Sequence, residues 1–159
     1  HFDQFTDNLV RTGQRDGAVL AYGGLGVVNT AGSVGNSVKT IAATTDTVAG
    51  VVALTYVDET ATDSNSRPGV KDDQAVNILS KGVVAVYCVE AVDLTDAVRV
   101  YHAADTGVTA GSFAGRFAAT AASGKTAVLG GARWVSKTTA AGIALLELNG
   151  PDFSLTADT

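Results

Sequence analysis

Apolar and polar residues alternate over many short stretches of the chain, with turn residues between them. These stretches are rich in Val, Thr and Ala, and branched side chains fit a pleated, half-buried strand better than a helix. No long window shows the 3.6-residue spacing of an amphipathic helix. The pattern predicts strands at residues 18–22, 27–29, 37–42, 48–57, 74–80, 82–90, 97–103, 112–119, 126–130, 132–137 and 142–149. Many short strands with Gly-rich turns predict an all-β fold with little helix, a small barrel or a sandwich.

Two pairs of these segments show how the strands should join. We expect segments 74–80 and 82–90 to meet at a turn formed by Lys81 and Gly82. Both faces of segment 82–90 are apolar, which predicts a central strand: Val84, Val86 and Cys88 alternate with Val83, Ala85, Tyr87 and Val89. Segments 132–137 and 142–149 flank a short connection and predict a hairpin, with Trp134 in the core.

The length of 159 residues fits one domain or two very small ones. Residues 1–17 are polar and irregular, and we interpret them as an N-terminal arm or docking segment. Residues 18–159 form a single β domain in this interpretation. Phe2, Phe5 and Leu9 fall at helix-like spacing, so they either form a short turn that docks on a partner or pack on their own domain.

The longest interruption of the apolar pattern is residues 58–73, which should form an exposed polar loop. The loop is either a plain connection, a partner-binding element or a boundary between two sub-domains. If it binds a partner, Arg67 and Pro68 are its candidate contacts. The candidate partner contacts of the whole chain are therefore Phe2, Phe5, Leu9, Arg67 and Pro68.

Charge and hydropathy narrow the class of partner. The net charge is −5, and the 11 Lys and Arg residues are scattered, whereas proteins that bind nucleic acids present a basic patch. The longest apolar runs are well short of the ~20 residues that a membrane helix needs, and no signal peptide opens the chain. We expect neither a nucleic acid nor a membrane as partner. Because the chain starts at His1 and lacks Met, we also expect that it is not the whole translated product.

Candidate chemistry is sparse. His102 is the one internal histidine, and no nucleophile motif accompanies it. Gly124, Lys125 and Thr126 resemble the end of a phosphate-binding loop but lack its earlier glycine, so we interpret them as a turn. The densest carboxylates match no calcium-loop spacing: Asp58, Glu59, Asp63, Asp72 and Asp73. Cys88, alone in an apolar run, predicts a buried, inert thiol.

These residues predict no enzyme, no metal and no cofactor, but they leave two alternatives open. A hydrolase would require His102, Asp105 and a serine in one pocket. A small β-sandwich module that recognises sugar or a host surface would require exposed aromatic residues around one groove. The candidates for that groove are Tyr22, Tyr87, Tyr101 and Trp134.

Two sequence patterns resemble a known family. The middle of the chain fits VNxLxxGxVxV through Val76, Asn77, Leu79, Gly82, Val84 and Val86. The C-terminal part fits AxW…GxAxLxL through Ala132, Trp134, Gly142, Ala144, Leu146 and Leu148. With its Gly, Ala, Val and Thr content, the chain from about residue 18 to 151 resembles the decoration or cement proteins of tailed bacteriophage heads.

This resemblance implies a protein that binds the exterior of an assembled capsid, where it bridges neighbouring capsomers against internal DNA pressure. It implies the major capsid protein as partner and a homo-oligomer, either a dimer or a trimer. A lattice offers many copies of one weak site, so linked copies gain avidity. The family has no catalytic motif, so no catalytic residue can be carried over to this chain.

Overall fold

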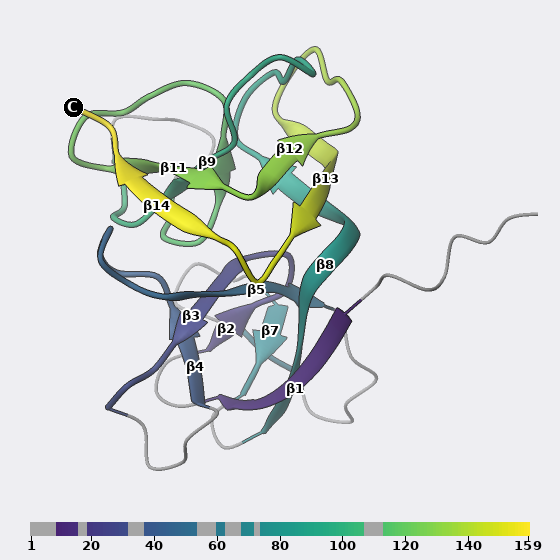
Figure 1. Ribbon diagram of the computed structural model, residues 1–159, viewed down its shortest axis with the longest axis vertical. Coiled ribbons are helices and arrows are strands. Elements are labelled where there is room, and N and C mark those ends of the chain that lie inside the picture. Colours follow the sequence, from purple (N-terminus) through teal and green to yellow (C-terminus); the bar gives the residue numbers. More distant parts are fainter. Residues whose placement is uncertain are drawn as a thin grey trace, which may run out of the picture.

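The computed structural model describes residues 9–15, 19–31, 37–53, 60–62, 68–71, 74–106 and 113–159. Strands and turns, without any helix, make up these residues, so the predicted all-β class is confirmed in a sandwich-like arrangement (Figure 1). The strands are β1 (Leu9–Arg15), β2 (Leu20–Ala21), β3 (Leu25–Val28), β4 (Ser37–Thr40), β5 (Val48–Ala53), β6 (Thr60–Thr62), β7 (Pro68–Val70), β8 (Ala75–Cys88), β9 (Arg99–Tyr101), β10 (Phe117–Ala118), β11 (Thr126–Gly130), β12 (Ala132–Trp134), β13 (Gly142–Asn149) and β14 (Ser154–Ala157).

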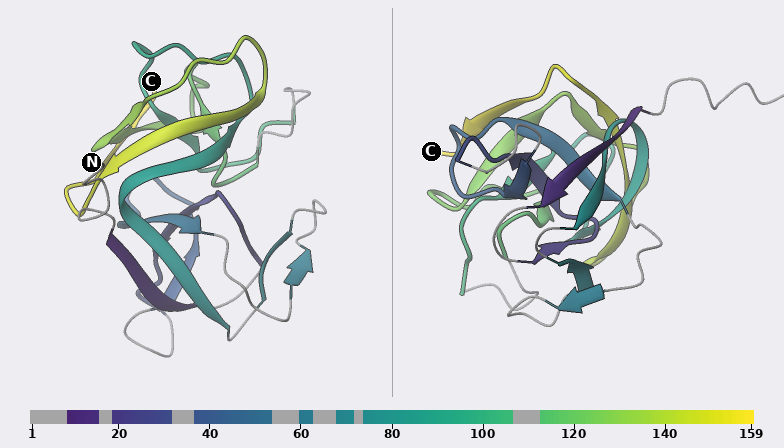
Figure 2. Two further views of the ribbon diagram at one scale, coloured as in Figure 1. Left: turned by 90° about the vertical axis from the view of Figure 1, so that its right-hand side faces the viewer. Right: turned by 90° about the horizontal axis from the view of Figure 1, so that it is seen from below.

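Eleven strands belong to one sheet, and the views in Figures 1 and 2 divide it into a lower and an upper lobe. In the lower lobe, the pairings run from β1 through β4, β3 and β5 to β8, and β1 also pairs with β8. In the upper lobe, β8 continues to β10, β9, β11 and β14, while β13 pairs with β8 and β12. The β12–β13 pair confirms the predicted hairpin.

Strand β8 connects the two lobes, and here the predicted turn at Lys81 and Gly82 is wrong. The chain does not reverse: Lys81 pairs with Leu9 of β1 on one side and with Asn149 of β13 on the other. Gly82 adopts a φ of 120°, which bends the strand without ending it. Segments 74–80 and 82–90 are therefore one strand of 14 residues that passes through both lobes (Figure 2).

The predicted exposed loop at residues 58–73 is also partly wrong, because it contains two strands. β6 pairs with β7, and β7 pairs with β2, so the three form a small second sheet. Val70 is fully buried there with Leu20. Gly69 is required at this position, because a Cβ atom would lie 2.3 Å from the carbonyl oxygen of Leu20. Three-residue strands are too short to show alternation, which explains the missed prediction.

The main core lies between the strands of the upper lobe and the top of the lower lobe. Phe117 and Trp134 meet edge to face there, with ring centroids 6.4 Å apart and an interplanar angle of 81°. Both are buried, as is Cys88, so the predicted core positions of Trp134 and Cys88 are confirmed. Burial raises the pKa of the Cys88 thiol, which keeps it protonated and unreactive.

Candidate interaction surface

The C-terminal half of β8 and the whole of β13 form a two-stranded ribbon with one side open to solvent. Pairs such as Tyr87 with Ile143 and Ala85 with Leu145 fix its register. Because side chains alternate between the faces of a strand, odd-numbered residues of both strands share one side. We call this side the outer ribbon face, and it consists of Val83, Ala85, Tyr87, Ile143 and Leu145.

This face is apolar and exposed. The exposed fractions of Val83, Ile143 and Leu145 are 51%, 64% and 42%, and Ala85 is exposed beside them. Contiguous apolar patches that are exposed on a soluble protein often mark interaction sites.

The opposite side of the same ribbon is core. Val86 and Cys88 of β8 lie there with the even-numbered residues of β13, all with an exposed fraction of 1% or less: Ala144, Leu146 and Leu148. The predicted central position of segment 82–90 holds only at its end, because β13 pairs along one edge of it and β10 pairs with the other edge only at Cys88. Apolar residues on both faces did not, however, mean burial on both faces.

Charged residues flank the outer ribbon face at its two ends. At one end, Arg133 of β12 forms an ion pair with Glu147 of β13. At the other, the Arg116 guanidinium lies 4.3 Å from the centre of the Tyr87 ring, a cation–π contact. An apolar centre within a charged rim is the usual anatomy of a protein–protein interface.

A small pocket adjoins the face at Tyr87. Its volume is about 120 Å³, and its lining comprises Ala21, Tyr22, Gly23, Gly24, Pro68, Tyr87, Gly115 and Arg116. Sites for small molecules usually measure roughly 300–1,000 Å³. The pocket is instead of a size to admit a single side chain, since a cavity of about 150 Å³ holds one benzene molecule.

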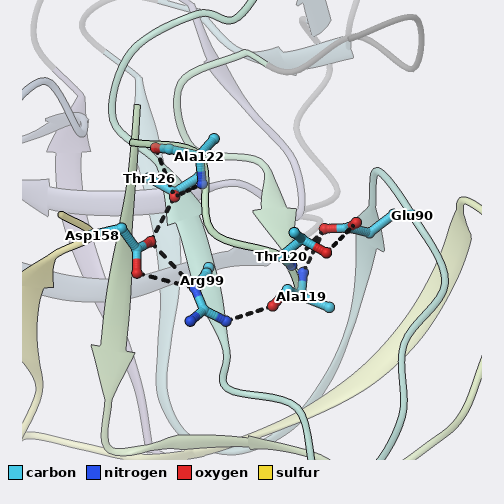
Figure 3. Close-up of polar contacts among 7 residues, drawn as sticks. All are labelled: Glu90, Arg99, Ala119, Thr120, Ala122, Thr126 and Asp158. Atoms are coloured by element: carbon cyan, nitrogen blue, oxygen red, sulfur yellow. Dashed lines mark hydrogen bonds and ion pairs between the residues drawn. The ribbon is translucent and has the colours of Figure 1, made fainter. Parts of the chain in front are cut away.

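A polar cluster lies elsewhere, in the upper lobe (Figure 3). The Arg99 Nε donates to both carboxylate oxygens of Asp158, at 3.1 and 3.2 Å, and the Thr126 hydroxyl donates to the same carboxylate at 2.6 Å. Arg99 also donates to the Ala119 carbonyl at 2.5 Å, and the Glu90 carboxylate accepts the backbone N–H of Ala119. Each charge is satisfied internally, so this cluster ties the C-terminal strand to the sheet and is not a reactive site.

The predicted contact residues have different outcomes. Phe2, Phe5 and Arg67 lie outside the described residues. Leu9 is the first residue of β1, where its backbone pairs with Lys81. Pro68 is exposed and borders the pocket next to the outer ribbon face. The pattern alone did not single out the exposed face, although it did assign Val83, Ala85 and Tyr87 to one side of a strand.

Two of the segments considered for chemistry, at His102 and at Gly124–Thr126, lie side by side. His102 is half-buried, and its backbone N–H donates to the Lys125 carbonyl at 2.9 Å. Gly124 has a φ of 68° in a turn that leads into β11, so the predicted turn is confirmed. The five loop carboxylates at positions 58, 59, 63, 72 and 73 lie outside the described residues, and the described ones include no group of three potential metal ligands. They also include no helix long and apolar enough to cross a membrane.

Comparison with known proteins identifies the family of the chain. Residues 4–149 match the family model described as "Structural cement protein (E217 gp24/Pam3 gp6)". The chain belongs to this family. No curated protein sequence matches it significantly. A chain from the solved structure "The capsid of Myoviridae Phage XM1" has a similar fold, with a TM-score of 0.64 and 16% sequence identity, over 89% of this chain and 83% of that one.

Family membership confirms the resemblance found in the sequence. The protein is a structural component of a bacteriophage virion and is associated with the capsid. The outer ribbon face lies wholly within the matched residues, whereas β14 lies beyond them.

Proposed function

We propose that the protein binds the outer surface of an assembled phage head and cements neighbouring capsomers against internal pressure. In this proposal it works without catalysis, its partner is the major capsid protein, and it sits on the capsid exterior as a dimer or trimer. The observation that carries the proposal is the outer ribbon face, an exposed apolar surface on a member of a structural, capsid-associated family.

The physical basis is burial of that face on a capsid subunit. Covering apolar surface contributes roughly 25 cal/mol per Å², and the charged rim formed by Arg116, Arg133 and Glu147 can orient the docking. The pocket beside Tyr87 can receive a side chain of the capsid subunit as an anchor. Contacts from Phe2, Phe5, Leu9 and Arg67 remain part of the proposal as a second point of attachment.

A sugar-binding module is less well supported. Tyr22 and Tyr87 do share a pocket, but Tyr101 and Trp134 are buried, so two of the four candidate aromatic residues are unavailable. The pocket volume of about 120 Å³ is also below that of most small-molecule sites.

The direct test adds purified protein to expanded heads that lack it. We expect saturable binding, with a stoichiometry tied to the capsid symmetry, and release of packaged DNA at a higher temperature. Bound protein is counted by gel densitometry of purified heads, and heads already saturated with the protein serve as the control. Absence of binding to heads of the same phage would contradict the proposal.

A matched pair of variants locates the contact. Ile143→Lys places a charge in the middle of the outer ribbon face, while Leu94→Lys makes the same kind of change at an exposed leucine outside it. We expect Ile143→Lys to weaken head binding at least about tenfold, which corresponds to 1.4 kcal/mol, and Leu94→Lys to bind like the wild type. Both should keep the wild-type circular dichroism spectrum. Equal binding by both variants would mean that another surface makes the contact.

A further inference from the structure

Strand β14 forms one end of the larger sheet. Its four residues pair with β11 through Ala127 and Ala157, Val128 and Thr156, Leu129 and Leu155, and Gly130 and Ser154. On its other edge no described strand pairs with it.

The hydrogen bonds of β11 determine which backbone groups of β14 face its open edge. Leu129 donates its N–H to Val98 of the loop before β9, so odd-numbered residues of β11 face β9 and even-numbered ones face β14. Accordingly, the Thr126 carbonyl accepts the N–H of Asp158 at 3.2 Å. Because antiparallel pairing alternates, residues 154, 156 and 158 face β11. The N–H and C=O groups of Leu155 and Ala157 therefore point away from the sheet.

The residue that follows this edge strand is held firmly, and the strand itself carries no charge and no Pro. The carboxylate of Asp158, with an exposed side-chain fraction of 8%, is held by Arg99 and by the Thr126 hydroxyl (Figure 3). Natural edge strands are usually guarded by shortness, by charged residues such as Lys, by Pro or by a bulge. β14 is short, with four residues, but its sequence Ser-Leu-Thr-Ala contains no charge and no Pro, and its pairing with β11 has no bulge. A firmly held strand with free donors and acceptors is a template for another strand.

We propose that β14 pairs antiparallel with β14 of a second copy across a two-fold axis at Thr156. In this register Leu155 exchanges two hydrogen bonds with the partner's Ala157, and Ala157 exchanges two with the partner's Leu155. Thr156 then faces the partner's Thr156 as a non-hydrogen-bonded pair, a favourable cross-strand combination.

A second copy fits this edge better than an unrelated strand. Antiparallel pairing of identical strands is self-complementary, and each copy supplies what the other lacks. No charged side chain lies within residues 154–157 to repel its counterpart. Ser154 would lie opposite the partner's Asp158, whose charge Arg99 already neutralises.

This pairing deepens the proposed function, and its biological meaning rests on that function. In Figure 1, β14 lies at the left of the upper lobe and β8 with β13 at the right. A β14 dimer therefore leaves both outer ribbon faces free to bind two capsid subunits. A weak pairing in solution would be strengthened on the lattice, because docking raises the effective concentration of the second copy.

Disulfide trapping tests the register. In a non-hydrogen-bonded pair the Cα atoms lie about 4.5 Å apart, within the range that a disulfide spans. Thr156→Cys should give disulfide-linked dimers under mild oxidation. Ser154→Cys, the matched control, should stay monomeric on a non-reducing gel, because its counterpart would be about 13 Å further along the strand. The buried Cys88 should not interfere. Equal cross-linking of both variants, or of neither, would overturn the proposal.

Sedimentation of the full chain tests the edge itself. Ala157→Pro removes an outward N–H while it leaves the bonds to β11 intact, and we expect it to weaken dimerisation at least about tenfold. Ala157→Val keeps that N–H and should dimerise like the wild type. A wild-type chain that is monomeric at about 1 mM, or an Ala157→Pro variant that dimerises normally, would overturn the pairing. A dimer that fails to bind heads would instead overturn the proposed function, whereas a wild-type monomer that binds them would overturn the pairing alone.

Discussion

The two faces of the β8–β13 ribbon have nearly the same apolar composition but opposite environments. On the inner face, Leu146 and Val86 are buried against Trp134 and its neighbours. On the outer face, Ile143 and Leu145 are exposed. In a monomer the inner face stabilises the fold and the outer face adds little. An exposed apolar face that the monomer does not need for its fold is the physical basis of the proposed contact with a capsid subunit.

Leu145 and Leu146 are adjacent in β13 but lie on opposite faces of the ribbon, and the larger loss of stability should come from Leu146. Leu146→Ala should lower the free energy of unfolding by about 2–5 kcal/mol, because it leaves a cavity in the core. Leu145→Ala, one residue away, should change it by no more than about 0.5 kcal/mol. Chemical denaturation measures both values. Head binding should weaken for Leu145→Ala, whereas Leu146→Ala should bind heads like the wild type wherever it is folded. Similar losses of stability in the two variants would show that the outer face is covered within the monomer.

Replacement of Arg116 at the rim of the outer ribbon face should have a smaller effect on stability. Arg116→Lys keeps the charge but loses the planar guanidinium that stacks on Tyr87, so the free energy of unfolding should fall by about 0.5–1 kcal/mol. Chemical denaturation should detect this loss, and head binding should weaken a few-fold because the Tyr87 ring is held less firmly. Unchanged values in both measurements would mean that packing alone positions the ring.

The smallest effect concerns the end of the ribbon. Lys137 donates to the Asp93 carboxylate at 2.7 Å and joins the loops that follow β12 and β8. This contact lowers the pKa of Asp93 below its ordinary value of 3.8. The resulting stabilisation is present above that value and is lost as the pH falls through the folded-state pKa. In Lys137→Gln the Asp93 pKa, followed by NMR titration, should rise toward 3.8. An unchanged pKa would show that the ion pair is not formed in solution.

The sequence pattern predicted the strands that have clear borders. Segments 126–130 and 142–149 are β11 and β13, each preceded by a turn, and the alternation of β13 shows which residues are buried. Strands β6, β7 and β14 were missed because they have only three or four residues, whereas β1, with seven, was missed because its polar sequence was interpreted as part of an arm. Their extended conformation depends on pairing with distant strands, which local propensity does not encode.

The candidate site was only half visible in the sequence. Alternation assigned Val83, Ala85 and Tyr87 to one side of a central strand, but it could not show that Val83 and Ala85 are exposed there. The position of covering strands depends on topology. The polar cluster was invisible for a related reason, since Arg99 and Asp158 are brought together by pairings of β11 with both β9 and β14.

Strand β8 also determines when the chain can fold during synthesis. β1 is made before its antiparallel partner in β8, which extends to Lys81, so the lower lobe cannot close until that part of β8 has been synthesised. The C-terminal half of β8 cannot complete its pairing until β13, which ends at Asn149, has also been synthesised. Such distant pairings slow folding and leave strand edges open in the meantime. A nascent chain halted before residue 142 therefore leaves the β13-facing backbone edge of residues 81–88 unpaired, and an open strand edge of this kind favours aggregation.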